Sequence, residues 1–424
     1  MHREAVAVET QGEDQRPLAG VTVLDLTTAL AGPYCTLLLA GLGAKVLKVE
    51  NPKGGETARN NAPYLGEDGV TLTRSSDEDI SLALLDRNRD KYGVTLDLKH
   101  PDAPDVLRDL VEACDIMVTN FSPIALTKLG VDYDSIRAID PSIVYCTISG
   151  FGADSPPERG KAMDTMIQAM SGLMMTSGKP EDGPVRVGVP VADVTAPLFA
   201  ALGIVAGLRR AERTGEGDHL DVSMLGSVTA MVALEHWSVL EQLGMPTRTG
   251  NVLPRLTPFG IFGTADGQFV AICAPTDALA AGLFRAMGIE DPAADPRLGT
   301  RDQRVASSDE VTEMIESWTR QQTRAELMQL LTEHGVPATA VREPSEAVAD
   351  PLLLARGETL PIEHPIHGSV AEVHGTGMPI HAASGAYGFQ RHAPGLGEHN
   401  TLAYGEVLGY SPERIEQLRD AGVI

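Results

Sequence analysis

The chain of 424 residues has few cysteines, no long hydrophobic run and no cluster of residues with zinc-ligand spacing. Its 4 cysteines are scattered without a CxxC pair, which predicts buried free thiols, a reducing environment and a cytoplasmic location. Without a His/Cys/Asp group at zinc spacing, no metal site is expected. The apolar runs are far shorter than a membrane span, and the first residues lack the apolar core of a signal peptide.

Basic residues are also scarce. The 34 lysines and arginines are outnumbered by 58 aspartates and glutamates, so the formal net charge is −24 at pH 7. This balance argues against nucleic acid or an anionic membrane as a partner. An anionic ligand would need a locally basic pocket. Hydrophobic residues make up 43% of the chain and charged residues 22%, the proportions of a soluble globular protein.

Short apolar segments alternate with helical patterns in the first half of the chain. Strands are expected at residues 21–26, 44–50, 93–98, 115–119 and 142–148. Helices are expected from Pro33 to about Gly41 and over 101–113. Such alternation predicts an α/β fold with a parallel, doubly wound sheet. A long helix should follow Asp193, where apolar residues recur at three- and four-residue spacing.

A second composition begins near Gly250, where short strands are expected around 259–262 and 268–272. We therefore divide the chain into four parts. These are a flexible leader (1–16), a large domain (17–225), a linker and small domain (226–335), and a return segment that completes the large domain (336–424).

The strand–helix–strand pattern that ends at Glu50 also suggests a dinucleotide-binding site. Such a site needs a G-x-G-x-x-G turn, so that the main chain can approach the pyrophosphate closely. The turn at residues 27–33 has the single glycine Gly32. A nicotinamide cofactor is therefore not expected.

Several short motifs follow one another along nearly the whole chain. They are PLAGV (17–21), AGP (31–33), LGAKVLKVE (42–50), LDLK (96–99), TNF (119–121), ISGFG (148–152), QAMSG (168–172), RTGEG (213–217) and PFG (258–260). In this order and spacing they resemble the class III (CaiB/BaiF-type) CoA-transferase family. That family also includes formyl-CoA transferase, carnitine CoA-transferase and α-methylacyl-CoA racemase.

The resemblance implies a fold, an activity and a partner. The fold is a Rossmann-like large domain, with a parallel sheet built from both chain ends, plus a smaller α+β domain in an interlocked homodimer. The activity is transfer of CoA from an acyl-CoA donor to a free carboxylic acid. Acyl-CoA is then a substrate, and no cofactor is bound permanently.

The family's nucleophilic aspartate matches Asp193, in the segment VADV (191–194). The resemblance implies attack of this carboxylate on the donor thioester, then an acyl anhydride and an aspartyl-CoA thioester. The alternative interpretation is an ordinary helix N-cap. The residues that match CoA-binding positions are Leu30, Ala31, Leu96, Lys99, Asn120, Phe121, Lys128, Lys161 and Met163. For each lysine the alternative is a solvated surface residue.

Two departures from the family pattern bear on the reaction. Racemases of the family have a histidine where this chain has Met163, and methionine cannot carry a proton. Formyl-CoA transferases have a glutamine where this chain has Leu30, and a poly-glycine loop where it has only Gly250. An acid that is larger or more apolar than formate or oxalate is therefore expected. A racemase-type isomerase and a non-catalytic CoA-binding protein remain the alternatives.

Overall fold

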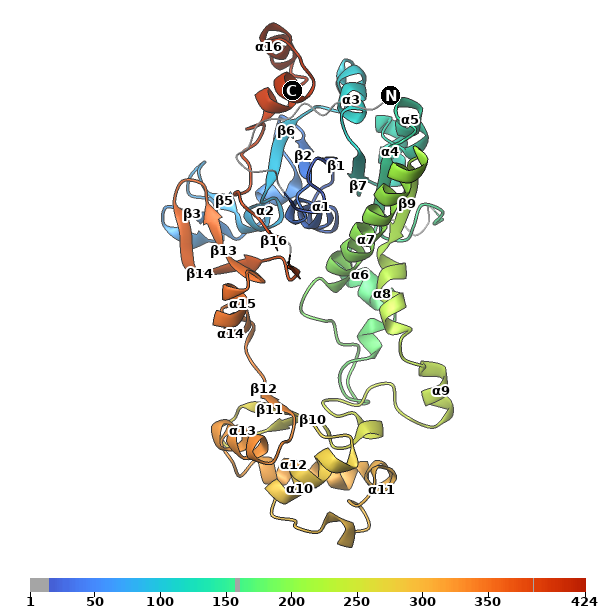
Figure 1. Cartoon of the computed structure of the whole chain (residues 1–424), viewed down its shortest axis with the longest axis vertical. Coiled ribbons are helices and arrows are strands. Elements are labelled where there is room, and N and C mark those ends of the chain that lie inside the picture. The colour runs from blue at the N-terminus through green and yellow to red at the C-terminus, as the bar shows by residue number, and fades with distance from the viewer. Residues whose placement is uncertain (1–14, 157–160, 384) are drawn as a thin grey trace. The chain divides into compact units, whose positions relative to one another are not determined.

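The computed structural model describes residues 15–156, 161–383 and 385–424, and it divides into two compact units (Figure 1). Unit 1 comprises Met1–Ser171, Val187–Val232 and Val348–Ile424. Unit 2 comprises Gly172–Arg186 and Ala233–Ala347. Of the expected leader, residues 1–14 lie outside the described residues.

A six-stranded sheet forms the centre of unit 1, in the order β6-β2-β1-β7-β8-β9. Its strands are β1 (Thr22–Leu26), β2 (Lys45–Glu50), β6 (Lys91–Thr95), β7 (Ile116–Thr119), β8 (Val144–Ser149) and β9 (Asp218–Ser223). Every neighbouring pair is parallel. The central strands are buried and largely apolar, as expected when helices cover both faces. The predicted α/β class with a parallel sheet is confirmed.

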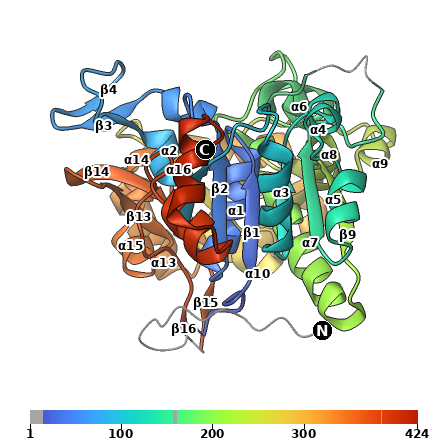
Figure 2. The same ribbon diagram turned by 90° about the horizontal axis from the view of Figure 1, so that it is seen from above.

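Helices cover both faces of this sheet. The helices α3 (Ala103–Glu112) and α16 (Pro412–Asp420) belong to one apolar core with the strands, and they lie in front of β1 and β2 in Figure 2. The helices α1 (Ala31–Gly41) and α7 (Val191–Thr214) pack against each other on the opposite face. The remaining helices of unit 1 are α2 (Leu82–Arg87), α4 (Pro123–Leu129), α5 (Tyr133–Ile139), α6 (Asp164–Met170), α8 (Met224–Val232) and α15 (Pro351–Ala355).

The C-terminal segment covers the edge of the sheet without adding a strand to it. The main-chain N–H of His399 donates to Gly93 O at 2.9 Å, and Gly93 N–H donates to His399 Nδ1 at 3.1 Å. Asn400 Oδ1 accepts from Thr95 N–H at 2.9 Å. Residues from both chain ends belong to unit 1, but all six strands of the parallel sheet lie within residues 22–223. The C-terminal end therefore contributes to the large domain and not to its sheet, and its side chains satisfy the open edge of β6. Residues beyond 400 add helices to the core instead.

Smaller sheets complete unit 1. The strands β3 (Tyr64–Gly66), β4 (Gly69–Thr71) and β5 (Ile80–Ser81) form one, and β13 (Thr359–His364) pairs with β14 (Gly368–Thr376). The strands β15 (His381–Ala382) and β16 (Gly385–Ala386) form a further pair.

Unit 2 is an α+β arrangement built on an antiparallel sheet. Its strands are β10 (Phe259–Gly263), β11 (Phe269–Cys273) and β12 (Ala338–Ala340). Its helices are α9 (Trp237–Gln242), α10 (Asp277–Ala286), α11 (Arg301–Ala306), α12 (Ser308–Thr319) and α13 (Arg324–Glu333). The short helix α14 (Pro344–Val348) ends at the boundary with unit 1. Apolar residues of α10, α12 and α13 pack on the sheet and form a core separate from that of unit 1.

The helix α7 carries two different apolar faces. Small residues such as Ala196 and Ala200 are buried, which lets α7 lie close to its neighbours. Leu198 and Leu202 are 53% and 69% exposed. By length and composition α7 could cross a membrane, but the core helices of soluble proteins meet the same criteria. Within unit 1, α7 packs against α1, β8 and β9, which accounts for its buried face.

Candidate active site

Asp193 lies in the first turn of α7, but a different aspartate caps this helix. Pro190 occupies the N-cap position, and no side chain at that position makes a capping hydrogen bond. Asp164 Oδ1 accepts a hydrogen bond of 2.8 Å from the main-chain N–H of Ala192. The N-cap interpretation of Asp193 is therefore wrong. Within the described residues, no hydrogen bond or ion pair within 4.0 Å occupies the Asp193 carboxylate.

The surroundings of Asp193 change its acidity. Burial and the neighbouring carboxylate of Asp164 raise the pKa of Asp193 to about 6, and the positive charge of Arg87 acts in the opposite direction. At neutral pH the group is still largely ionised, and its higher pKa makes the anion more nucleophilic than an ordinary carboxylate. A half-buried carboxyl with a pKa raised in this way is typical of functional sites.

A buried glutamine holds the capping aspartate in place. Gln168, in α6, donates from Nε2 to Asp164 Oδ2 at 2.8 Å and to Val189 O at 3.3 Å. Its Oε1 accepts from the main-chain N–H of Val187 at 3.0 Å. The amide therefore ties α6 to the segment that leads into α7. This frame fixes the Asp164 carboxylate relative to Asp193.

The turn between β1 and α1 is held by side chains from two other segments. Thr28 N–H donates to Asn120 Oδ1 at 2.9 Å, and Asn120 Nδ2 donates to Thr28 O at 2.8 Å. Ala29, with φ of 69°, donates its N–H to Glu56 Oε2 at 2.8 Å. These bonds place Leu30 and the first residue of α1, Ala31. The structure thus brings the predicted residues Asn120, Leu30 and Ala31 to one turn.

A fully buried charge cluster lies beneath this turn. Lys91 Nζ lies 3.1 Å from Asp25 Oδ2, and Lys48 Nζ lies 3.5 Å from Asp25 Oδ1. Burial opposes the ionisation of Asp25, but the two lysines and the hydroxyls of Thr27 and Thr36 lower its pKa well below the ordinary value. Lys48 Nζ also donates to Thr27 O. The cluster therefore supports the turn from below.

The predicted nucleotide-contacting residues follow neighbouring strand ends. Leu96 is buried after β6, Phe121 is half-buried after β7, and Lys99 and Lys128 are exposed. The carboxyl ends of parallel strands share one edge of the sheet, where α/β proteins bind ligands. A hollow opens there between α3 and α5, lined by Leu98, Ala103, Pro104, Leu107, Arg108, Leu129, Gly130, Ser135 and Ile139. It combines apolar walls with a basic side chain, Arg108.

Lys161 and Met163 lie apart from these residues in the sequence, directly before α6. Both are exposed, and the Met163 side chain is 70% exposed. Met163 is the residue before Asp164, so it lies close to the frame that holds the start of α7. Within the described part of the chain, no hydrogen bond or ion pair joins either residue to Lys99 or Lys128.

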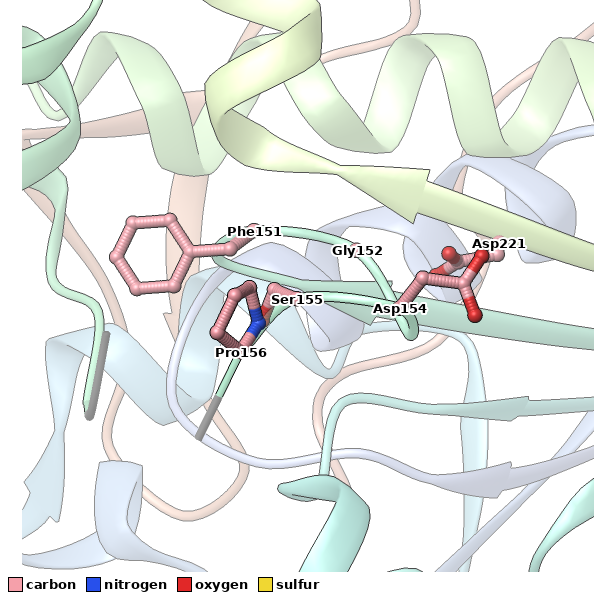
Figure 3. Close-up of a pocket in the computed structure, with 6 residues that line it drawn as sticks. All are labelled: Phe151, Gly152, Asp154, Ser155, Pro156 and Asp221. Atoms are coloured by element: carbon pink, nitrogen blue, oxygen red, sulfur yellow. The ribbon is translucent and has the colours of Figure 1, made fainter. Parts of the chain in front are cut away.

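A second hollow follows β8 (Figure 3). It is lined by Phe151, Gly152, Asp154, Ser155, Pro156 and Asp221. Asp221 Oδ2 accepts from Ala153 N–H at 2.7 Å, which holds the loop. Among the described residues, its lining includes two carboxylates and no cationic side chain, an arrangement that does not favour the phosphates of CoA.

Three comparisons with known proteins bear on this site. Residues 18–400 match the family described as CoA-transferase family III. The chain belongs to this family. A relative named succinate–glutarate CoA-transferase, from Agrobacterium fabrum, is 34% identical, with 92% of this chain and 96% of the relative covered. An acetyl-CoA:oxalate CoA-transferase from Acetobacter aceti is also 34% identical, over 82% of this chain and 86% of its own length.

A solved structure extends the comparison to the fold. A CAIB/BAIF family protein from Brucella suis has a TM-score of 0.79 and 31% identity, with 93% of this chain and 100% of that chain covered. The resemblance inferred from the motifs is confirmed, and the chain is a CoA-transferase of family III. An acyl-CoA and a carboxylic acid are the substrates that this class of enzyme uses.

The sequence motifs included Gln168 but did not indicate what it does, and they did not include Asp164. They missed Arg87, whose Nη1 donates to Ala29 O at 3.0 Å and which interacts electrostatically with Asp193. The sequence did carry a signal for Arg87, because it is a basic residue that lies shortly before the buried strand β6 in an acidic chain.

Proposed function

We propose that Asp193 is the nucleophile of this CoA-transferase. The observation that carries the proposal is that Asp164, not Asp193, caps α7, which leaves the Asp193 carboxylate available at the helix N-terminus. A helix N-terminus stabilises an anion, and the raised pKa strengthens the nucleophile. No proton has to move in the exchange, so no general base is needed.

The exchange takes four balanced steps. An Asp193 oxygen attacks the donor's thioester carbonyl, the C–S bond breaks, and an acyl-aspartyl anhydride and CoA thiolate form. The thiolate attacks the aspartyl carbon and releases the donor acid, which leaves an aspartyl-CoA thioester. The acceptor carboxylate then displaces the thiolate and forms a second anhydride. The thiolate attacks the acceptor's acyl carbon, which forms the new acyl-CoA and regenerates Asp193.

The CoA moiety is proposed to bind along the carboxyl edge of the sheet. The proposed contacts are Leu30, Ala31, Leu96, Lys99, Asn120, Phe121, Lys128, Lys161 and Met163. Lys99 is an exposed cation shortly after β6, Lys128 is an exposed cation in the last turn of α4, and the hollow beside α3 offers apolar walls to the adenine. Because both polar ends of the Asn120 side chain bond to Thr28, Asn120 acts by placing the β1–α1 turn.

The substrates are proposed to be dicarboxylic acids and their CoA esters, as the name of the succinate–glutarate relative suggests. The enzyme is proposed to work as an interlocked homodimer. The exposed apolar side chains of α7, which include Leu198, Phe199 and Leu202, support an interface there.

Replacement of Asp193 by alanine tests the proposal. We expect Asp193→Ala to lower the rate of CoA transfer by at least about three orders of magnitude, because no other group replaces the nucleophile. The variant should stay folded and keep the wild-type mass in light scattering. Near-native turnover in this variant would contradict the mechanism.

A further inference from the structure

Arg59, Arg87 and Arg89 lie in the segment that runs from η1 (Thr57–Asn60) to β6, and Arg59 and Arg89 each bond to a neighbouring carboxylate. Arg59 donates from Nε and Nη2 to the two oxygens of Glu50, both at 2.7 Å. Arg89 donates from Nη2 to Asp86 Oδ1 at 2.8 Å, and its guanidinium lies over the ring of Phe389. Both have a fixed structural partner.

Arg87 differs from these two. It is half-buried at the end of α2, and its Nη1 donates to Ala29 O at 3.0 Å. Among the described residues this is its only hydrogen bond, and no carboxylate lies within the 4.0 Å of an ion pair. A partly buried cation without an anionic partner is unfavourable, and a guanidinium has five N–H groups in a fork that fits a carboxylate.

The neighbouring carboxylates are already committed elsewhere. Asp86 Oδ1 accepts from Arg89 and from the main-chain N–H of Thr376. Glu56 Oε2 accepts from Ala29 and Ala58, and Glu56 Oε1 accepts from Asn88 Nδ2. Within the described residues, Arg87 therefore keeps donor groups that no neighbouring side chain uses.

The position of Arg87 relates it to the reacting carboxylate. Its bond to Ala29 O anchors it at the turn that precedes Leu30 and α1, and α1 packs against α7, which carries Asp193. Arg87 and Asp193 also interact electrostatically. In a chain of net charge −24, a cation with unused donors at this position would attract a substrate anion.

We infer that Arg87 binds the second carboxylate of a dicarboxylic substrate, the one that does not react, through a paired hydrogen bond from its guanidinium. This inference rests on the proposed function, and it makes Arg87 the residue that distinguishes dicarboxylic from monocarboxylic acids. The same group would be recognised in the free acid and in its CoA ester. Leu30, next to the anchoring turn, would contact the methylene chain between the two carboxylates.

Matched substrates test the inference. CoA transfer is measured with glutarate against pentanoate as acceptor, and with succinyl-CoA against butyryl-CoA as donor. The proteins are wild type, Arg87→Gln, Arg87→Lys and Arg419→Gln. Arg419 is an exposed residue of α16 paired with Glu416, so its replacement removes the same charge away from the site.

Arg87→Gln should lower kcat/KM for the dicarboxylic substrate by about 10- to 100-fold, mainly through KM, and change the monocarboxylic value by less than about threefold. Arg87→Lys should retain part of the preference, and Arg419→Gln all of it. Equal losses with both acids would mean that Arg87 only supports the Ala29 turn. No loss in either, or a wild type without a preference, would overturn the inference too. The ratio of kcat/KM for the dicarboxylic substrate to that for the monocarboxylic substrate does not depend on whether Asp193 becomes acylated. A failure of the proposed Asp193 mechanism can therefore be distinguished from a failure of this inference.

Discussion

Asp164 caps the helix that carries Asp193, and its negative charge raises the pKa of the Asp193 carboxyl. One side chain thus positions the proposed nucleophile and adjusts its acidity. The oxygen that caps α7 and the charge that acts on Asp193 can be separated by substitution, because asparagine retains an acceptor oxygen without the charge.

Asp164→Asn should therefore shift the acidic limb of the kcat/KM profile toward lower pH. The wild-type limb should lie near pH 6, the pKa of Asp193, below which the nucleophile is protonated. The measurement is kcat/KM between pH 4.5 and 8.5. An unchanged limb would show that Asp164 does not influence the ionisation of Asp193. Asp164→Ala, which removes the cap as well, should lose about 0.5–2 kcal/mol of stability.

Asp193 itself should be a source of instability. Its pKa is about 6 in the folded protein against an ordinary value of 3.8, so folding favours the protonated form. The contribution of this carboxyl group to the free energy of unfolding is fully present below pH 3.8 and is lost as the pH rises through about 6. Asp193→Asn should therefore be inactive but more stable than wild type at pH 8, by on the order of 1 kcal/mol after allowance for screening.

Urea denaturation of both proteins at pH 5 and pH 8 tests this prediction. The amount by which the unfolding free energy of Asp193→Asn exceeds that of wild type should be larger at pH 8 than at pH 5. A variant that is less stable than wild type at pH 8 would mean that the helix N-terminus outweighs the burial of the charge.

The charged residues of the buried cluster below the β1–α1 turn should depend on one another for their contribution to stability. Lys91→Met leaves Asp25 with one lysine partner, and we expect a loss of about 3–5 kcal/mol. The double variant Asp25→Asn/Lys91→Met should lose less than the sum of the two single variants. Urea unfolding of the four proteins measures the coupling. Additive losses would show that the two charges do not stabilise each other.

The proposed CoA contacts should affect one substrate selectively. Lys128→Ala and Lys161→Ala should each raise KM for acyl-CoA about two- to tenfold and leave KM for the acid unchanged, because each lysine provides a cation for an anionic ligand. Arg419→Gln again serves as the charge control. An increase confined to the KM for the acid would mean that these lysines bind the acid and not the CoA moiety.

Met163 distinguishes transfer from racemisation. Methionine cannot exchange protons, so a chiral 2-methylacyl-CoA incubated with the enzyme in deuterium oxide, without an acid acceptor, should keep its configuration and take up no α-deuterium. Mass spectrometry and chiral chromatography measure both. Rapid α-deuteration would show that another base, such as Asp164, replaces the missing histidine.

The periodicity of the sequence predicted five of the six sheet strands within a few residues, since buried parallel strands are short apolar runs. It missed β9, the edge strand, which is only partly buried and contains Asp218, His219 and Asp221. It also predicted the helix after Asp193. The leucines that revealed this helix, Leu198 and Leu202, are exposed, whereas small residues such as Ala196 and Ala200 face the core. Burial of a close-packed helix depends on small residues, which a search for large apolar residues does not find.

The site was only partly predictable, because its residues come from separate parts of the chain. The motifs identified Asp193 as the candidate nucleophile, but a motif does not reveal which aspartate caps a helix. The role of Asp164 depends on a hydrogen bond to Ala192, 28 residues away. Arg87 is recognisable as a binding group only when the partners of Asp86 and Glu56 are known. Such relationships arise from tertiary packing.

The central claim is that Asp193 carries the acyl and CoA groups during transfer. The most direct measurement is to incubate the enzyme with acyl-CoA alone, treat it with borohydride or hydroxylamine, and locate the modified residue by peptide mass spectrometry. The account predicts reduction or hydroxamate formation at Asp193, dependent on acyl-CoA and absent in Asp193→Ala. Full transfer activity with an unmodified Asp193, or with a donor-dependent modification at another residue, would contradict it.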